Sequence, residues 1–93
     1  MRYNSELNYQ IEYYDPKADD MIQVHTDSLA KAIIALITRS RRYPNRRIDL
    51  TPSGSDTCLG TYEDGEYRWQ LELENPDWQK YIQYKLEKKE ASE

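Results

Sequence analysis

The dipeptide Asp64-Gly65 constrains the fold of this chain more than any other pair of residues. Both central residues of a type I′ turn need a positive φ, and Asp-Gly is a preferred pair for that turn. A two-residue loop here joins two antiparallel strands and sets their register. We therefore predict that Tyr62 lies opposite Tyr67 and that Gly60 lies opposite Trp69. The indole then covers the bare backbone of a glycine, which is otherwise costly in a strand.

Extended further from the turn, the same register places Cys58 opposite Leu71. We expect this face, which also carries Leu73, to enter the core. The opposite face then receives Leu59, Thr61, Arg68, Gln70 and Glu72. The register also sets Glu63 against Glu66, a like-charge pair that weakens the pairing, so a longer loop is the alternative.

Alternating residues predict a second hairpin nearer the N-terminus. The apolar positions of its first strand are Leu7, Tyr9, Ile11 and Tyr13. Residues 15–20 have the proline and aspartates of a turn, and we expect a loop of six residues. A second strand over 21–25 returns with Ile22 and Val24 facing inward.

The hydrophobic period changes from two to three or four between Ser28 and Arg42, which predicts an amphipathic helix. Its apolar positions are Leu29, Ala30, Ala32, Ile33, Leu36 and Ile37. Either Thr26 or Asp27 is expected to cap its first N–H groups, and Pro44 ends it. A short strand over 47–51 follows.

A second helix is predicted to begin after Asn75, which is suited to capping, with Pro76 at the first helical position. Its buried stripe is expected to contain Trp78, Tyr81, Ile82 and Lys85 or Leu86. Residues 88–93 have no apolar period, and we expect them to fray.

These elements follow one another in the order β-β-α-β-β-β-α. We therefore predict an α+β fold, a single domain over residues 1–93 with a frayed tail at 88–93. In this two-layer sandwich, two helices pack on one face of a mostly antiparallel five-strand sheet. A β-grasp-like arrangement is the alternative topology. Tyr9, Tyr13, Tyr62 and Tyr67 fall on predicted core faces, where their hydroxyls must reach the sheet rim to be hydrogen-bonded.

The formal net charge of −4 is distributed in blocks along the chain. Residues 31–47 carry six basic side chains and no acidic one, whereas the segments on either side are acidic. The residues we single out as partner-binding candidates are Arg39, Arg41, Arg42, Tyr43, Arg46 and Arg47. Arginine and tyrosine are enriched at protein interfaces, and arginine forks also suit phosphate oxygens. A solvated helix C-terminus, where cations favour the helix dipole, explains the same pattern.

No residues are predicted to have catalytic, cofactor-binding or metal-binding roles. Cys58 and His25 are the sole cysteine and histidine, which excludes an intramolecular disulfide and a cysteine-rich zinc site. The spacing of a calcium-binding EF-hand loop is not matched by Asp15, Asp19 and Asp20. We expect these aspartates to belong to a turn. Glu72 and Glu74 are expected to share a strand face, but no nucleophile accompanies them.

The function that we expect is a non-enzymatic protein–protein interaction module, an adaptor or inhibitor that docks a larger partner through charged surfaces. A small acidic domain of this kind fits bacterial or phage-borne regulators. The alternative is a nucleic-acid-binding module that uses the block from Arg39 to Arg47, which the sequence pI of 5.0 makes less favourable. A lone free thiol suggests the cytoplasm, and no apolar run is long enough for a membrane span. Both a monomer and a homodimer are compatible with the sequence.

Overall fold

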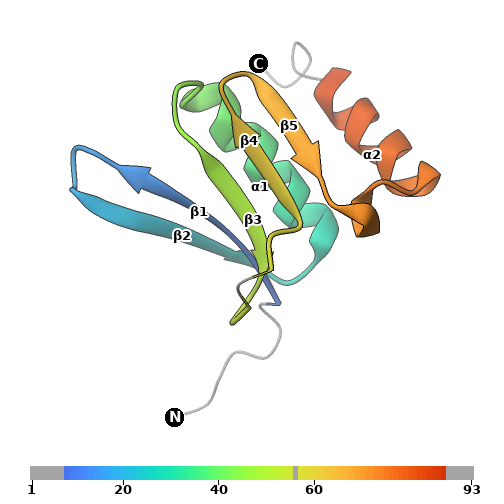
Figure 1. Cartoon of the computed structure of the whole chain (residues 1–93), viewed down its shortest axis with the longest axis horizontal. Coiled ribbons are helices and arrows are strands. Elements are labelled where there is room, and N and C mark those ends of the chain that lie inside the picture. The colour runs from blue at the N-terminus through green and yellow to red at the C-terminus, as the bar shows by residue number, and fades with distance from the viewer. Residues whose placement is uncertain (1–7, 56, 88–93) are drawn as a thin grey trace.

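A computed structural model describes residues 8–55 and 57–87 of the chain. Its elements are β1 (Tyr9–Asp15), β2 (Asp20–Thr26), α1 (Leu29–Arg42), β3 (Ile48–Pro52), β4 (Gly60–Glu63), β5 (Glu66–Trp69), the short 3₁₀ helix η1 (Leu71–Leu73) and α2 (Pro76–Glu87). The strands form one sheet in the order β2-β1-β3-β4-β5, and every neighbouring pair is antiparallel (Figure 1). The predicted α+β class and the order of its elements are confirmed.

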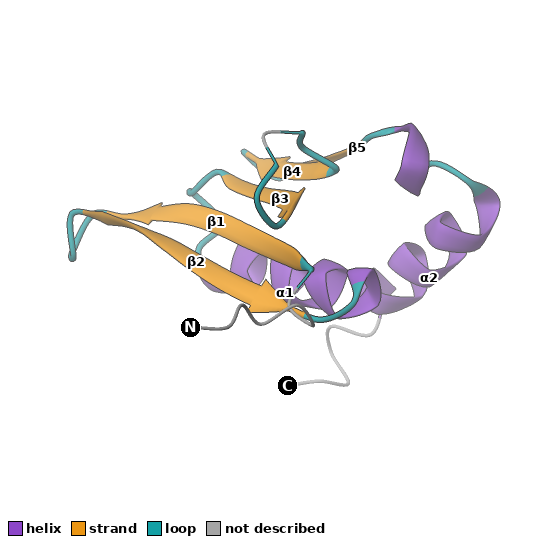
Figure 2. Ribbon diagram, turned by 90° about the horizontal axis from the view of Figure 1, so that it is seen from below, coloured by secondary structure: helices purple, strands orange, loops and turns teal. Residues whose placement is uncertain are grey.

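The two helices lie on the same side of the sheet. Figure 2 shows α1 across the strands and α2 beside it, beyond the end of the sheet that carries β5. The largest fully buried apolar residues come from the strands, the helices and η1: Ile11, Ile33, Leu36, Ile48, Leu50, Leu73 and Ile82. The opposite face of the sheet has no helix over it in the described part of the chain, so polar side chains of the strands cover it.

The turn between β4 and β5 is the two-residue loop that the sequence predicts. Asp64 and Gly65 both have a positive φ, 52° and 85°. Tyr62 pairs with Tyr67, and Gly60 pairs with Trp69. The like charges at the end of the hairpin do not open it, because Arg68 makes ion pairs with both glutamates, at 3.6 Å to Glu63 and 3.4 Å to Glu66.

Beyond Gly60 the predicted register is wrong. Leu59 is buried, with 6% of its surface exposed, whereas Leu71 is 80% exposed. The Leu59 N–H donates to the Leu50 carbonyl at 2.7 Å, and Leu50 also pairs with Gly60. Two residues of one strand thus lie against one residue of its neighbour, which is a bulge that reverses the side-chain alternation. Leu59 therefore enters the core, and Cys58 does not.

Three smaller expectations also need correction. The first hairpin has a four-residue loop rather than a six-residue one, since Asp15 pairs with Asp20. Ser28, not Thr26 or Asp27, caps α1, with its hydroxyl accepting from the Lys31 N–H at 3.1 Å. Glu72 and Glu74 do not share a strand face, because the chain forms η1 there.

Several other predictions about these elements are confirmed. Tyr9, Ile11 and Tyr13 face inward on β1, and Ile22 and Val24 do so on β2. The Asn75 side chain caps α2 by accepting from the Trp78 N–H at 2.9 Å. The expectations for Leu7 and for the tail over 88–93 lie outside the described residues.

Candidate functional site

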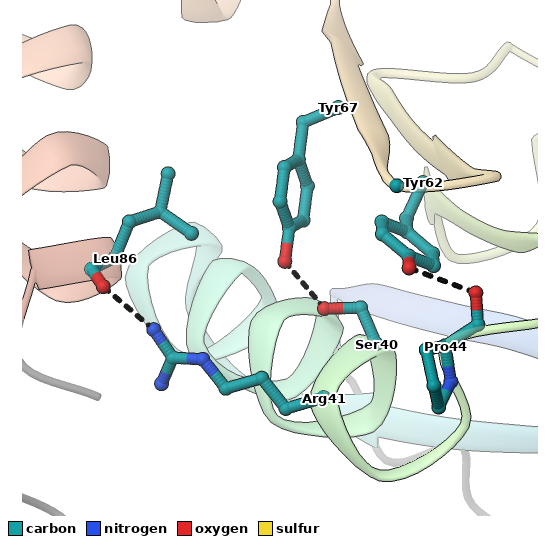
Figure 3. A pocket seen from close by; sticks show the side chains of 7 residues that line it. Ser40, Arg41, Pro44, Tyr62, Tyr67 and Leu86 are labelled. Carbon is teal, nitrogen blue, oxygen red and sulfur yellow. Dashed lines mark hydrogen bonds between the residues drawn. The ribbon is translucent and has the colours of Figure 1, made fainter. Parts of the chain in front are cut away.

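The predicted arginine block does not form one surface. Successive residues of an α-helix point about 100° apart, so neighbours in sequence are directed to different surroundings. Arg41 lies against α2, where its Nη2 donates to the carbonyl oxygens of Leu86, at 2.8 Å, and Lys85, at 3.3 Å (Figure 3). These carbonyls belong to the last described turn of α2. Arg41 therefore ties the end of α2 to the end of α1.

A second group of these residues gathers around the ring of Tyr43. The guanidinium carbon of Arg46 lies 4.1 Å from the ring centroid, and that of Arg42 lies 6.0 Å from it. The ring also packs on Tyr13, with centroids 5.6 Å apart. Arg46 is further held by Asp15, at 3.8 Å. The result is an aromatic platform of fixed orientation flanked by two cations.

The remaining two arginines lie apart from this platform. Arg47 precedes β3 and pairs with Asp49 at 3.2 Å, on the sheet face without helices. The hydrogen bond and charge of Asp49 raise the pKa of Arg47. Arg39 is half-buried, and its Nε is buried with no hydrogen-bond partner among the described residues.

A tyrosine-walled pocket lies where the ends of α1 and α2 meet the β4–β5 turn. It encloses about 470 Å³ and is lined by Ser40, Arg41, Pro44, Tyr62, Gly65, Tyr67 and Leu86 (Figure 3). Its volume falls within the range of pockets that bind small molecules or anchor side chains. The sequence pattern predicted that both tyrosines face the core, and that expectation is confirmed. Their hydroxyls were expected at the sheet rim, but they reach the Pro44 carbonyl and the buried Ser40 of α1. What the pattern missed is that Arg41 and Leu86 close the other side.

The hydroxyl groups of the pocket form a defined pattern of hydrogen bonds. Ser40 donates its hydroxyl proton to the Ile37 carbonyl at 2.7 Å, so the hydrogen bond between Ser40 and Tyr67 has the phenol as donor. Tyr62 donates to the Pro44 carbonyl at 2.8 Å. The O–H groups of both phenols are therefore already engaged as donors. The phenol oxygens keep lone pairs that can accept a hydrogen bond from a ligand. Burial raises the pKa of Tyr67 above its ordinary value.

Arg41 provides the donors of the pocket. Its Nε and Nη1 make no hydrogen bond with the described residues, because Nη2 alone reaches the α2 carbonyls. A guanidinium with free N–H groups suits a carboxylate or phosphate oxygen. The pocket thus combines one cationic donor with aromatic walls and two phenol acceptors. This arrangement can hold an acidic side chain.

A shallower polar hollow of about 660 Å³ lies on the opposite face of the sheet. Asp49 accepts there from Thr61, at 3.1 Å, and Cys58 contacts the same threonine hydroxyl at 3.0 Å. Arg47 lines the same hollow and pairs with Asp49. The structure therefore brings Cys58 into a hydrogen-bonded network with Thr61 and Asp49.

Comparisons with known proteins identify no relative of this chain. No protein-family model, no curated protein and no solved structure matches it. Within residues 8–55 and 57–87, no three or more histidine, cysteine, aspartate or glutamate side chains group as a metal site would require. None of the described helices is long and apolar enough to span a membrane.

Arg41→Ala is expected to release the end of α2 and to lower the free energy of unfolding by about 1–2 kcal/mol, since charge-assisted hydrogen bonds to carbonyls are lost. Hydrogen exchange should become faster in the last turn of α2 while the amides of β1 and β3 keep their protection. Arg42→Ala is the matched control, because that side chain is exposed and makes no hydrogen bond with the described residues. Equal exchange in the two variants would show that Arg41 does not hold α2.

Proposed function

We propose that this chain is a non-enzymatic protein–protein interaction module, an adaptor or inhibitor that docks an acidic surface of a larger partner. Its docking surface is the end of the molecule at which α1 ends, called here the α1-end surface. This surface consists of the tyrosine-walled pocket and the platform of Arg42, Tyr43 and Arg46 beside it. The observation that carries the proposal is the pocket, in which Arg41 stands between Tyr67 and the end of α2.

The chemistry of the α1-end surface matches that of protein-binding hot spots. Tyrosine and arginine dominate such sites, and they contribute most where they are pre-ordered and line a depression. Tyr67 and Tyr62 are fixed by their hydrogen bonds, and Arg46 is held on the Tyr43 ring. An aspartate or glutamate of the partner would enter the pocket and pair with the free N–H groups of Arg41. Further acidic residues would meet Arg42 at the rim.

Nucleic acid is the less favourable ligand for this surface. Tyr43, the residue suited to stacking on a base, already contacts Tyr13 and Arg46. Arg46 and Arg47 are paired with carboxylates, which reduces their capacity to bind phosphates. The β4–β5 turn also brings Asp64 to the border of the pocket, since Gly65 lines it. A phosphate backbone passing there would meet negative charge, whereas a protein surface can place one carboxylate and avoid the turn.

The proposal includes a cytoplasmic setting, such as that of small bacterial or phage-borne regulators. It is supported by the unpaired thiol of Cys58, which a reducing compartment preserves.

The experiment compares Arg42→Glu with Lys80→Glu, two exposed charge reversals of which only the first lies on the α1-end surface. Tagged proteins are used to capture partners from cells of the source organism. We expect wild type and Lys80→Glu to capture the same protein in equal amounts. Arg42→Glu should capture at least about tenfold less of it, because the reversed charge at the rim repels an acidic partner surface. Capture that both variants preserve equally would contradict the proposed surface.

The nucleic-acid alternative has its own measurement. Fluorescence anisotropy with labelled single- and double-stranded oligonucleotides at low salt should show no binding by the wild-type chain. Binding that weakens steeply with added salt, and weakens further in Arg42→Glu, would favour the nucleic-acid function instead.

A further inference from the structure

The outer edge of β2 pairs with no other strand in the part of the chain that the structure describes. β2 is the terminal strand of the sheet, and within residues 8–55 and 57–87 it pairs with β1 only. Exposed edges are commonly blocked by lysine, proline, a bulge or an inward-pointing charge. The segment Asp20–Thr26 contains no lysine or proline, and its seven pairs with β1 run without a bulge. The other edge strand, β5, has only four residues.

Two observations show which backbone groups of β2 point away from the sheet. The Asn8 carbonyl accepts from the Ser53 N–H at 2.9 Å, so the even-numbered residues of β1 face β3 and the odd-numbered ones face β2. Each odd-numbered residue of β1 lies opposite an even-numbered residue of β2. The backbone groups of the even-numbered residues of β2 therefore form hydrogen bonds with β1. Consistently, the Met21 N–H does not point to β1 but bonds the Asp20 carboxylate at 2.8 Å. Met21, Gln23 and His25 therefore direct their N–H and C=O groups outward, and the Met21 N–H must leave the Asp20 carboxylate to pair with another strand.

We propose that this edge pairs with the same edge of a second copy of the chain, antiparallel and with Gln23 on the two-fold axis. Outward-facing residues must meet outward-facing residues in such a pair. Among the possible registers, the one centred on Gln23 is the one that pairs all three of them in both copies. Gln23 faces its own counterpart, and Met21 faces the second copy's His25. The proposal does not depend on the α1-end surface.

Side chains are compatible with this register. On the helix side of the sheet, Ile22 meets Val24 of the second copy, and both are half-buried apolar residues in the isolated chain. On the open side, Met21 is 48% exposed and gains a partner in the second copy's His25. Asp20 lies opposite Thr26, so no like charges face each other along the strand. Pairing with a strand of a different protein would not require the sequence of β2 to be complementary to itself.

The register predicts which positions can be cross-linked. Substituted cysteines at position 23 would lie about 5 Å apart across the axis, whereas those at position 21 would be separated by four residues, about 13 Å along the strands. The experiment uses Gln23→Cys and Met21→Cys, each in a Cys58→Ser background, with a short bismaleimide. Both positions lie on the same strand and the same open face, so they differ only in distance from the axis.

We expect the full wild-type chain to show a mass of twice 11.1 kDa by light scattering at high protein concentration. Gln23→Cys should cross-link to a covalent dimer at least about tenfold faster than Met21→Cys. Faster cross-linking of Met21→Cys, or equal rates, would overturn the register. A wild-type chain that stays monomeric at every concentration would overturn the dimer itself, as would occupancy of this edge by a strand of another protein.

Discussion

Gly60→Ala is expected to lower the free energy of unfolding by about 2–3 kcal/mol, at the upper end of the usual cost of overpacking. A β-carbon at this position would lie 2.7 Å from both Cε3 and Cζ3 of Trp69. The indole cannot move aside freely, because it stacks on Tyr67 with the ring centroids 5.8 Å apart. The melting temperature should fall by roughly 4–8 °C per kcal/mol in a domain of this size.

The control for this prediction is a double-mutant cycle with Trp69→Leu, which removes the ring that the new methyl group would meet. In the Trp69→Leu background, Gly60→Ala should cost less than about 1 kcal/mol, the difference being the coupling between the two positions. Urea unfolding measures all four proteins. A loss below about 0.5 kcal/mol for Gly60→Ala in the wild-type background would show that the indole does not cover this glycine.

Ile82→Ala is expected to cost about 2–5 kcal/mol, the range for truncating a fully buried isoleucine. Ile82 is the one residue of α2 that is completely buried. The rest of the attachment comes from partly buried aromatic residues and from Arg41, whose bonds close the pocket. The loss of the side chain should therefore loosen α2 and open one wall of the pocket.

Two conservative variants make the Ile82 prediction specific. Ile82→Val should cost only about 0.5–1.5 kcal/mol, because it removes a single methyl group. Ile34→Ala removes the same atoms from an exposed position of α1 and should change stability by less than about 1 kcal/mol. Urea unfolding followed by tryptophan fluorescence reports on α2 through Trp78. Equal losses at positions 34 and 82 would mean that α2 is not anchored by Ile82.

The local signals in the sequence were sufficient to predict the elements and part of the register. Asp64-Gly65 determines the pairing of β4 with β5 because positive φ at both residues leaves little choice of turn. That register could not be extended to Leu59, because the bulge against Leu50 reverses the alternation and no residue type marks it. Leu71 was misplaced for a related reason, since the chain leaves the sheet after Trp69 and forms η1.

The candidate site was predictable in composition but not in arrangement. The distribution of charge along the sequence identifies the arginines. The surroundings of each arginine depend on its position around α1 and on contacts with α2, which is distant in sequence. Arg41 meets Leu86 only because Ile82 brings α2 beside α1. The hydroxyl contacts of Tyr62 and Tyr67 were foreseeable in kind, as buried phenols need partners. That their partners would be Pro44 and Ser40, and that a pocket would form there, follows from tertiary packing alone.

Photo-cross-linking from Asn45 determines whether a protein binds at the α1-end surface. Asn45 is exposed in the loop that carries Tyr43 and Arg46, so a benzoylphenylalanine there leaves every arginine in place. The control carries the same group at Gln83, an exposed position of α2. Irradiation in cells of the source organism should join one protein to position 45 and not to position 83. The absence of an adduct at position 45 would contradict protein binding at the α1-end surface. An adduct that nucleases remove would also contradict it, because the bound molecule would then be a nucleic acid.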